Sequence, residues 1–309
     1  MKLRPFQRMN YADVPAKPRI PHAYDRAQAR DVRVTSRVMG NVRVHVRVLG
    51  SGPPLLLVHG LMTSSYSFRY ILEPLAQHFQ VFALDLPGAG QSDKPAAPLF
   101  SAANLGVFLS EFQREMGLRG CAVLGNSLGG FISMHLALSD PEAISRLVVN
   151  HAPGIPDPRF KALKVLLSQS LVRKGLRFVV QRDVRRWIFR NVHYYDETLK
   201  SIEELDAFGQ PLATAEGMHC FLKYLRETMH PAGFAEFVAR LETSGLQTPT
   251  LFVYARQDPL VPPRVGETLH RLAPTSQLVW IDGTSHFTHV DSPDRMVATI
   301  LPFLLDASA

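Results

Sequence analysis

The residues best suited to chemistry are a serine, an aspartate and a histidine that lie far apart in the chain. Ser127 lies in Gly125-Asn126-Ser127-Leu128-Gly129, between an apolar run and a helix-like segment. Asp258 and His286 each come shortly after a later apolar run. A serine hydroxyl is a weak nucleophile and needs a base that a third group orients. The order Ser, acid, His therefore predicts a catalytic triad of Ser127, Asp258 and His286.

The segment around Ser127 has the G-x-S-x-G pattern of a nucleophile elbow. Such a turn holds the serine in a strained backbone conformation, with its hydroxyl beyond the end of the strand. Gly125 and Gly129 leave room for the tight crossing. A helix that begins at Leu128 would direct its free N–H groups toward the nucleophile.

Hydrolysis through a serine also needs two hydrogen-bond donors for the negative oxygen of the intermediate. We expect these donors to be the backbone N–H groups of Leu128, which follows the nucleophile, and of Leu61, in the loop after an apolar run. His59, in the same loop, is interpreted as a structural turn residue. His289 competes with His286 as the base, although its position three residues later favours a supporting role.

The elements that must position these residues can be read from hydrophobic patterning. Residues 32–48 alternate valines with polar residues around Gly40-Asn41, which predicts a two-stranded hairpin. Continuous apolar runs are typical of strands buried on both faces of a parallel sheet. They occur at 55–58, 81–84, 122–124, 147–149, 251–254 and 278–281, and helical patterns at 101–116 and 128–139 separate some of them. The prediction is an α/β fold, a mostly parallel eight-stranded sheet with helices on both faces.

The domain organisation follows from where this rhythm breaks. Residues 1–30 lack periodicity and are predicted to form an N-terminal arm. The core is expected at 31–154 and 246–309. Residues 155–245 contain no buried-strand run, and we interpret them as a helical insertion.

Composition excludes several classes of protein. The 309 residues carry a net charge of +7, but residues 1–50 and 159–190 are strongly basic and the remainder is acidic, which argues against nucleic-acid binding. The two cysteines lack metal-ligand spacing, and neither a signal peptide nor a transmembrane run is evident, so a cytoplasmic location is expected. No nucleotide loop or metal cluster is visible, and we expect neither cofactor nor metal.

The chain resembles the α/β-hydrolase superfamily over roughly residues 30–306. The resemblance rests on 57–60, on 84–93, on the elbow around Ser127, and on the segments that carry Asp258 and His286. It implies the triad and oxyanion hole assigned above. It also implies that residues 155–245 form a helical cap over the substrate pocket. The resemblance says little about the substrate, because this fold supports many activities.

Serine at position 127 favours attack on a carbonyl carbon, since relatives that displace at an sp³ carbon use a carboxylate nucleophile. A carboxylesterase is the favoured prediction. The elbow also resembles that of meta-cleavage C–C hydrolases, although the loop 61–65 lacks their glycines and Phe287 replaces their usual tryptophan. An acyltransferase or perhydrolase with the same triad stays open, as does a non-catalytic member of the fold.

Eleven of the 28 aromatic residues lie in the predicted cap, which favours a hydrophobic small-molecule ester as substrate. Candidate substrate contacts are Asn126, Trp187 and Phe287, although Asn126 is equally suited to a role in the turn. Residues 159–190 carry ten basic residues and one acid between apolar ones. This segment is either a solvated cap face or a weak contact with anionic membranes. The sequence does not indicate an oligomeric state.

Overall fold

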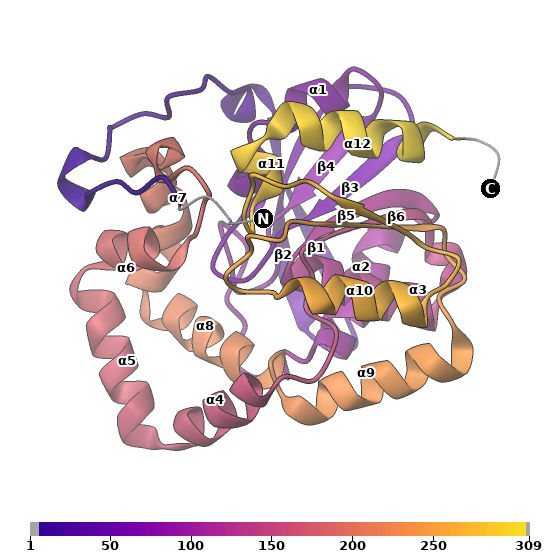
Figure 1. The fold of residues 1–309 in the computed structure, drawn as a ribbon. Helices are drawn as coiled ribbons and strands as arrows, with labels where there is room; N and C mark the ends of the chain where they lie inside the picture. The colour runs from indigo at the N-terminus through magenta and orange to yellow at the C-terminus, as the bar shows by residue number, and fades with distance from the viewer. Residues whose placement is uncertain (1–5, 307–309) are drawn as a thin grey trace.

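The computed structural model describes residues 6–306, and its centre is a single eight-stranded sheet (Figure 1). The strand order is β1-β2-β4-β3-β5-β6-β7-β8, with β1–β2 and β2–β4 antiparallel and all other pairs parallel. The predicted α/β class with a mostly parallel sheet is therefore confirmed. The strands are β1 (Gln28–Ser36), β2 (Gly40–Leu49), β3 (Pro54–Val58), β4 (Gln80–Leu84), β5 (Cys121–Asn126), β6 (Ile144–Asn150), β7 (Thr250–Tyr254) and β8 (Gln277–Trp280).

The parallel strands are mostly apolar because each of their two faces packs on a separate hydrophobic cluster. In β3, Leu56 and Val58 belong to one cluster, while Leu55 and Leu57 belong to the other. Successive side chains of a strand point to opposite faces, so alternate residues serve different clusters.

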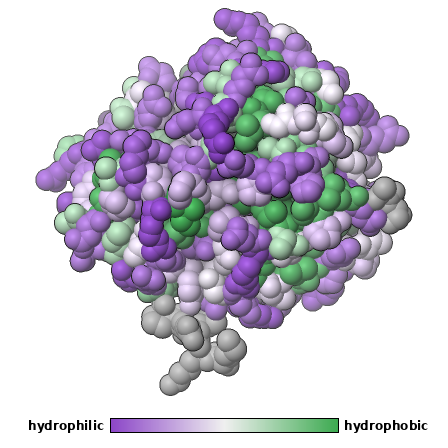
Figure 2. All heavy atoms as spheres, turned by 90° about the horizontal axis from the view of Figure 1, so that it is seen from above, coloured by the Kyte–Doolittle hydropathy of each residue, from purple (hydrophilic) through white to green (hydrophobic). Residues whose placement is uncertain are grey.

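Helices cover both faces of the sheet. Helices α1 (Leu72–Ala76) and α12 (Pro293–Leu305) lie on one face, and α2 (Ala102–Glu115), α3 (Leu128–Ser139) and α10 (Pro263–Leu272) lie on the other (Figure 1). Seen from above, the face over α12 presents hydrophobic patches between hydrophilic residues (Figure 2). Within residues 6–306, every helix is too short or too polar to cross a lipid bilayer.

The N-terminal hairpin forms, but its turn lies earlier than the sequence suggested. Ser36 of β1 pairs with Gly40 of β2, so Arg37 to Met39 make the turn. Gly40 opens β2 with a φ of +74°, a backbone conformation that glycine adopts without steric cost. The prediction of a turn at Gly40-Asn41 was therefore wrong by about two residues, because glycine marked the end of the turn and not its centre.

Between β6 and β7 the chain is helical. Phe234 of α9 stacks on Phe131 of α3 with ring centroids 4.9 Å apart, so this helix packs on the flank of the core. The other helices lie to one side of the sheet (Figure 1). The helices of this segment are α4 (Pro158–Ser168), α5 (Ser170–Arg182), α6 (Val184–Asn191), α7 (Ile202–Ala213), α8 (Ala215–Glu227) and α9 (Pro231–Ser244).

The predicted N-terminal arm runs against the helical segment. Gln7 donates its backbone N–H to the Tyr195 carbonyl, and Lys17 forms an ion pair with Glu203 of α7. Two short 3₁₀ turns, Tyr11–Asp13 and Tyr24–Arg26, precede β1. Residues 1–5 of the predicted arm lie outside the described residues.

Candidate active site

Ser127 occupies a sharp turn between β5 and α3. Its φ of +53° and ψ of −119° are unusual for a residue with a side chain. The turn is fixed on both sides, because the Ser127 N–H donates to the Asn150 carbonyl at 2.8 Å and the Ser127 carbonyl accepts from the Phe131 N–H at 3.1 Å. The hydroxyl-bearing residue is thus held at the carboxyl end of β5, as the elbow motif predicts.

The glycines of the motif permit the close crossing of strand and helix. A Cβ on Gly129 would lie 2.0 Å from the Val58 carbonyl oxygen, and one on Gly125 would lie 2.5 Å from the Gly130 Cα. Gly60, in the loop after β3, approaches the serine itself, since a Cβ there would lie 3.0 Å from the Ser127 Cβ. A side chain at Gly125 or Gly129 would displace backbone, and one at Gly60 would crowd the nucleophile.

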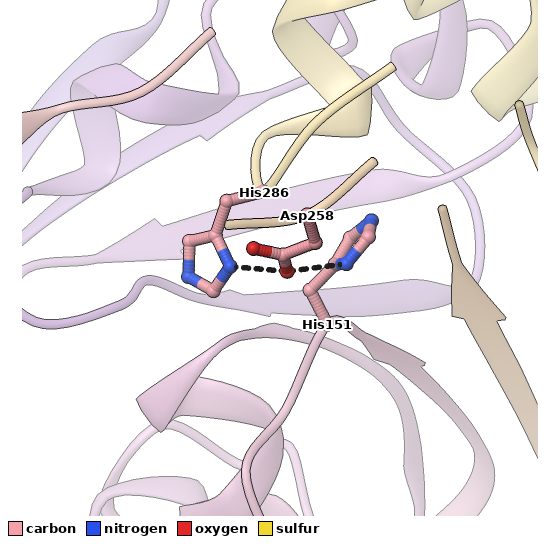
Figure 3. Close-up of side chains that lie close together, drawn as sticks. All are labelled: His151, Asp258 and His286. Carbon is pink, nitrogen blue, oxygen red and sulfur yellow. Dashed lines mark hydrogen bonds and ion pairs between the residues drawn. The ribbon is translucent and has the colours of Figure 1, made fainter. Parts of the chain in front are cut away.

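Asp258 and His286 are brought together from two different strand ends. Asp258 follows β7, and His286 lies between β8 and α11 (Thr288–Asp291). The Nδ1 atom of His286 lies 2.7 Å from Oδ2 of Asp258, as Figure 3 shows. The other oxygen, Oδ1, accepts the backbone N–H groups of Leu260 at 2.7 Å and Val261 at 3.1 Å. The carboxylate is therefore fixed in orientation.

The structure adds a residue that the sequence analysis missed. His151, directly after β6, places its Nδ1 2.8 Å from the same Oδ2 atom of Asp258 (Figure 3). Its Nε2 lies 2.9 Å from the hydroxyl of Thr288. Because a carboxylate only accepts hydrogen bonds, we assign the imidazole proton to Nδ1, and the Thr288 hydroxyl then donates to Nε2. The signal that could have found His151 is its position at the carboxyl end of a parallel strand.

Burial and mutual contact set the protonation states of Asp258 and His151. Burial alone would raise the pKa of Asp258, but the neighbouring His286 and His151 hold that pKa well below its usual range. Burial lowers the pKa of His151 although Asp258 acts in the opposite direction. We therefore expect an ionised Asp258 beside a neutral His151 at neutral pH.

Ser127 and His286 both line a cavity of about 550 Å³ between the strand ends and the helical segment. Trp187 of α6 and Phe287 line it as well, so both predicted contact residues reach the cavity. Most of the other lining side chains are apolar, among them Phe160, Leu163, Leu176, Phe221 and Leu225. No hydrogen bond joins Ser127 to His286 within residues 6–306, and catalytic pairs often tighten only when substrate binds.

Two polar residues near the serine do not reach this cavity. Asn126 is fully buried, and its Oδ1 accepts a hydrogen bond from Asn150 at 2.7 Å. The structure therefore does not place Asn126 as a substrate contact, because its side chain points into the core from the end of β5. His289 is also fully buried, and its Nδ1 lies 3.4 Å from the Asn150 amide nitrogen. It occupies a supporting position and not that of the base.

A second, much smaller cavity of about 30 Å³ adjoins the first. Leu61 and Leu128, whose backbone N–H groups are the predicted oxyanion donors, both line it. Gly60, Leu61, Met62 and Phe221 line both cavities, so the two spaces meet beside Ser127. His59 does not offer a free imidazole, since its Nε2 accepts the Leu86 N–H at 2.9 Å and its Nδ1 lies 2.8 Å from the Gly60 carbonyl.

Backbone strain concentrates at this site. Among residues 6–306, three residues other than glycine have positive φ: Met62 (+66°), Ser127 (+53°) and His151 (+49°). Met62 and Ser127 line the large cavity, and His151 contacts Asp258. Strain of this kind persists where the surrounding structure over-determines the backbone, and such positions cluster at functional sites.

Asp258, His151 and His286 are also the one group of three potential metal ligands found within the described residues. A zinc ion would need to lie about 2 Å from each ligand atom, which sets those atoms more than 3 Å apart in a tetrahedral site. The two nitrogens instead lie 2.7 and 2.8 Å from one carboxylate oxygen. Both distances are those of polar groups in direct contact, and they are shorter than the ligand separation in a zinc site.

Comparison with known proteins agrees with this geometry. The family model described as alpha/beta hydrolase fold matches residues 53–169, which include β3, β5 and the serine elbow. The chain has the α/β-hydrolase fold. An uncharacterized hydrolase of Bacillus subtilis is 27% identical to this chain, and the match covers 81% of the chain and 89% of the relative.

Two further similarities concern esterases. A pimeloyl-[acyl-carrier protein] methyl ester esterase of Xanthomonas campestris is 26% identical, over 84% of this chain and 98% of the relative. The solved structure of a thermophilic esterase from Thermogutta terrifontis has the same fold, with a TM-score of 0.70 and 22% identity over 89% of this chain and 98% of that one. The comparisons support a hydrolase and leave its bond and substrate open.

Proposed function

We propose that this α/β hydrolase cleaves carboxylic esters of hydrophobic small molecules through an acyl-enzyme formed on Ser127. The observation that carries the proposal is the convergence of Ser127 and His286 on one apolar cavity, with Asp258 bound to the far side of the imidazole. The relatives that act on methyl esters and other esters add support.

The proposed reaction begins with attack of the Ser127 oxygen on the ester carbonyl carbon. His286 removes the serine proton through Nε2, the imidazole nitrogen that Asp258 does not contact, and returns it to the departing alcohol. Asp258 keeps the proton of His286 on Nδ1 and stabilises the imidazolium that forms. Water then attacks the acyl-enzyme by the same route, which releases the acid and restores Ser127.

We assign the oxyanion hole to the backbone N–H groups of Leu61 and Leu128. Leu61 lines both cavities, and Leu128, which directly follows the serine in the chain, lines the small one. Leu128 is the first residue of α3, so its N–H belongs to the unpaired donors at the start of that helix. Preorganised donors of this kind stabilise the charge that develops on the carbonyl oxygen.

The helices over the cavity have the position of a cap. Phe160 and Leu163 of α4, Leu176 of α5 and Trp187 of α6 line the side of the cavity that faces away from the sheet. Apolar walls favour a hydrophobic substrate. We place the acyl or alkyl arm of the ester, whichever is larger, in this space.

The test combines covalent labelling with turnover. The wild-type chain should react with a fluorophosphonate probe and hydrolyse p-nitrophenyl butanoate, whereas Ser127→Ala should lose the label and at least about 10³-fold in kcat. Ser133→Ala is a matched control, because Ser133 is buried in α3, six residues after the nucleophile, and its hydroxyl donates to the Gly129 carbonyl. Labelling of Ser127→Ala, or turnover near the wild-type rate, would disprove the assignment.

A further inference from the structure

The outer surface of α4 and α5 is apolar where a solvated helix would be polar. Within residues 6–306, nine large hydrophobic residues are exposed, and six of them lie between positions 165 and 179. Leu171 is 79% exposed, Phe178 is 67% exposed and Val165 is 65% exposed. The six residues are Val165, Leu166, Leu171, Val172, Phe178 and Val179, and we call their exposed faces the α4–α5 surface.

These side chains are exposed on regular helix surfaces and not at frayed helix ends. In α5, Leu171 and Phe178 recur two turns apart, with Val172 and Val179 beside them, while Val180 points inward and is buried. In α4, Val165 lies opposite Phe160 and Leu163, which line the cavity, and Leu166 lies on the flank of the helix and is 54% exposed. The two helices form an outer corner of the molecule, remote from α12 (Figure 1).

The same surface is cationic and lacks acids. Residues 158–182 contain seven Lys or Arg residues and no Asp or Glu. Lys161, Lys164 and Lys174 have no carboxylate partner within the part of the chain that the structure describes. Arg185 and Arg186, which follow in α6, are paired with Asp206 and Asp183 and are therefore less available.

We propose that the α4–α5 surface docks reversibly on an anionic lipid bilayer. Exposed aliphatic and aromatic side chains enter the boundary between headgroups and acyl chains, while unpaired lysines remain among the anionic headgroups. A water-soluble partner without acidic residues would cover the apolar side chains but not neutralise the excess of positive charge, and a second copy of this chain would bring the same charges together. The lipid surface fits both observations.

Docking would place the cavity next to the source of its substrate. The inner faces of α4 and α5 line the large cavity, and their outer faces form the α4–α5 surface. An amphiphilic ester could then pass from the bilayer to Ser127 between these helices without crossing bulk water. This last step rests on the proposed ester hydrolysis, whereas the docking itself does not.

The experiment is co-sedimentation of the full chain with phosphatidylcholine vesicles and with vesicles that contain 30% phosphatidylglycerol. We expect binding to the anionic vesicles, weakened as NaCl is raised from 0.05 to 0.5 M, and little binding to the neutral ones. Replacing Lys161, Lys164 and Lys174 together by Glu should weaken partitioning at least about 100-fold. The control reverses Arg33, Arg114 and Arg271, which are exposed elsewhere, and should retain most of the binding.

The apolar contribution is tested separately. Leu171→Ser with Phe178→Ser should weaken partitioning at least about tenfold, whereas Leu99→Ser with Leu305→Ser, at exposed sites on other elements, should not. Ser127→Ala should bind vesicles like the wild type, so loss of hydrolysis and loss of docking are distinguishable. Absence of vesicle binding would overturn the proposal. So would a dimer in sedimentation velocity that the Leu171 and Phe178 changes dissociate, because a second copy would then cover this surface.

Discussion

His151 and His286 share one oxygen of Asp258, and the Nδ1 of His151 lies only 0.1 Å farther from it than the Nδ1 of His286, at 2.8 against 2.7 Å. His151 is fully buried and has a φ of +49°, so the backbone is strained to hold the ring there. Asp258 is thus bound on both sides and by two backbone N–H groups. We interpret His151 as a positioning residue for the proposed triad.

Replacing His151 with Asn tests this interpretation. Asn tolerates positive φ but is too short to replace the imidazole, so Asp258 loses a contact with the His151 N–H. The carboxylate then stabilises the protonated form of His286 more strongly. We expect kcat to fall about tenfold with little change in KM, and the acid limb of the pH–rate profile to move to higher pH.

The pH profile separates positioning from packing. A change that only loosened the core would lower kcat and the free energy of unfolding together but would leave the acid limb in place. Thr288→Val removes the partner of His151 Nε2 and should cause a smaller shift in the same direction. An unchanged pH–rate profile in both variants would show that His151 does not position the triad.

The sequence predicts the positions of Ser127, Asp258 and His286 because each follows an apolar strand, and the carboxyl ends of parallel strands meet at one edge. His151 satisfies the same rule after β6, but a single histidine in Asn150-His151-Ala152-Pro153 belongs to no motif. Its contact with Asp258 depends on the register of β6 beside β7, which pairs Asn150 with Val253. Register of this kind is a property of the assembled sheet.

The hydrophobic pattern of the sequence also does not determine which way an individual side chain points. Asn126 lies next to the nucleophile, yet the pleat of β5 directs its side chain into the core toward Asn150. In α4, apolar residues occur on all sides of the helix, and only the tertiary structure separates those that line the cavity from those that face solvent.

The elbow makes a prediction about stability. Gly129→Ala forces a Cβ to within 2.0 Å of the Val58 carbonyl oxygen, and backbone must move to relieve the clash. We expect a loss of more than about 3 kcal/mol in the free energy of unfolding, measured by urea titration. Gly175→Ala in α5 is the matched substitution, because nothing lies within 4 Å of the added methyl group. It should stabilise the chain by about 0.5–1 kcal/mol, and equal effects of the two changes would contradict the steric argument.

Buried histidines predict that stability falls in acid. Burial is the main cause that lowers the pKa of six histidines within residues 6–306, and these are His22, His59, His135, His151, His193 and His289. In the unfolded chain such residues take up protons near pH 6.5, whereas the folded protein resists protonation. The free energy of unfolding should therefore be highest above about pH 6.5 and should fall as the pH drops below it.

His135 offers the clearest single test. Burial, followed by the charge of Arg240, lowers its pKa to about 3, and its ring packs against Phe131 and Phe237. His135→Phe should reduce the loss of unfolding free energy between pH 7.5 and pH 5 by about 2 kcal/mol. His219→Gln changes an exposed histidine and should leave that difference unaltered. A pH dependence identical in His135→Phe and the wild type would refute the argument.

The unequal cavities predict the shape of the preferred ester. A space of about 550 Å³ and one of about 30 Å³ meet beside Ser127, so the ester carbonyl has room for one large apolar arm and one small arm. Methyl hexanoate or hexyl acetate should therefore exceed hexyl hexanoate in kcat/KM by at least about tenfold, since a few methylenes that find no space cost that much.

Leu212, which lines only the small cavity, and Leu225, which lines only the large one, provide the paired variants. Leu212→Ala should narrow the preference by admitting a longer second arm, and Leu225→Ala should preserve it. Faster turnover of hexyl hexanoate by the wild type would show that the small cavity does not bound the substrate.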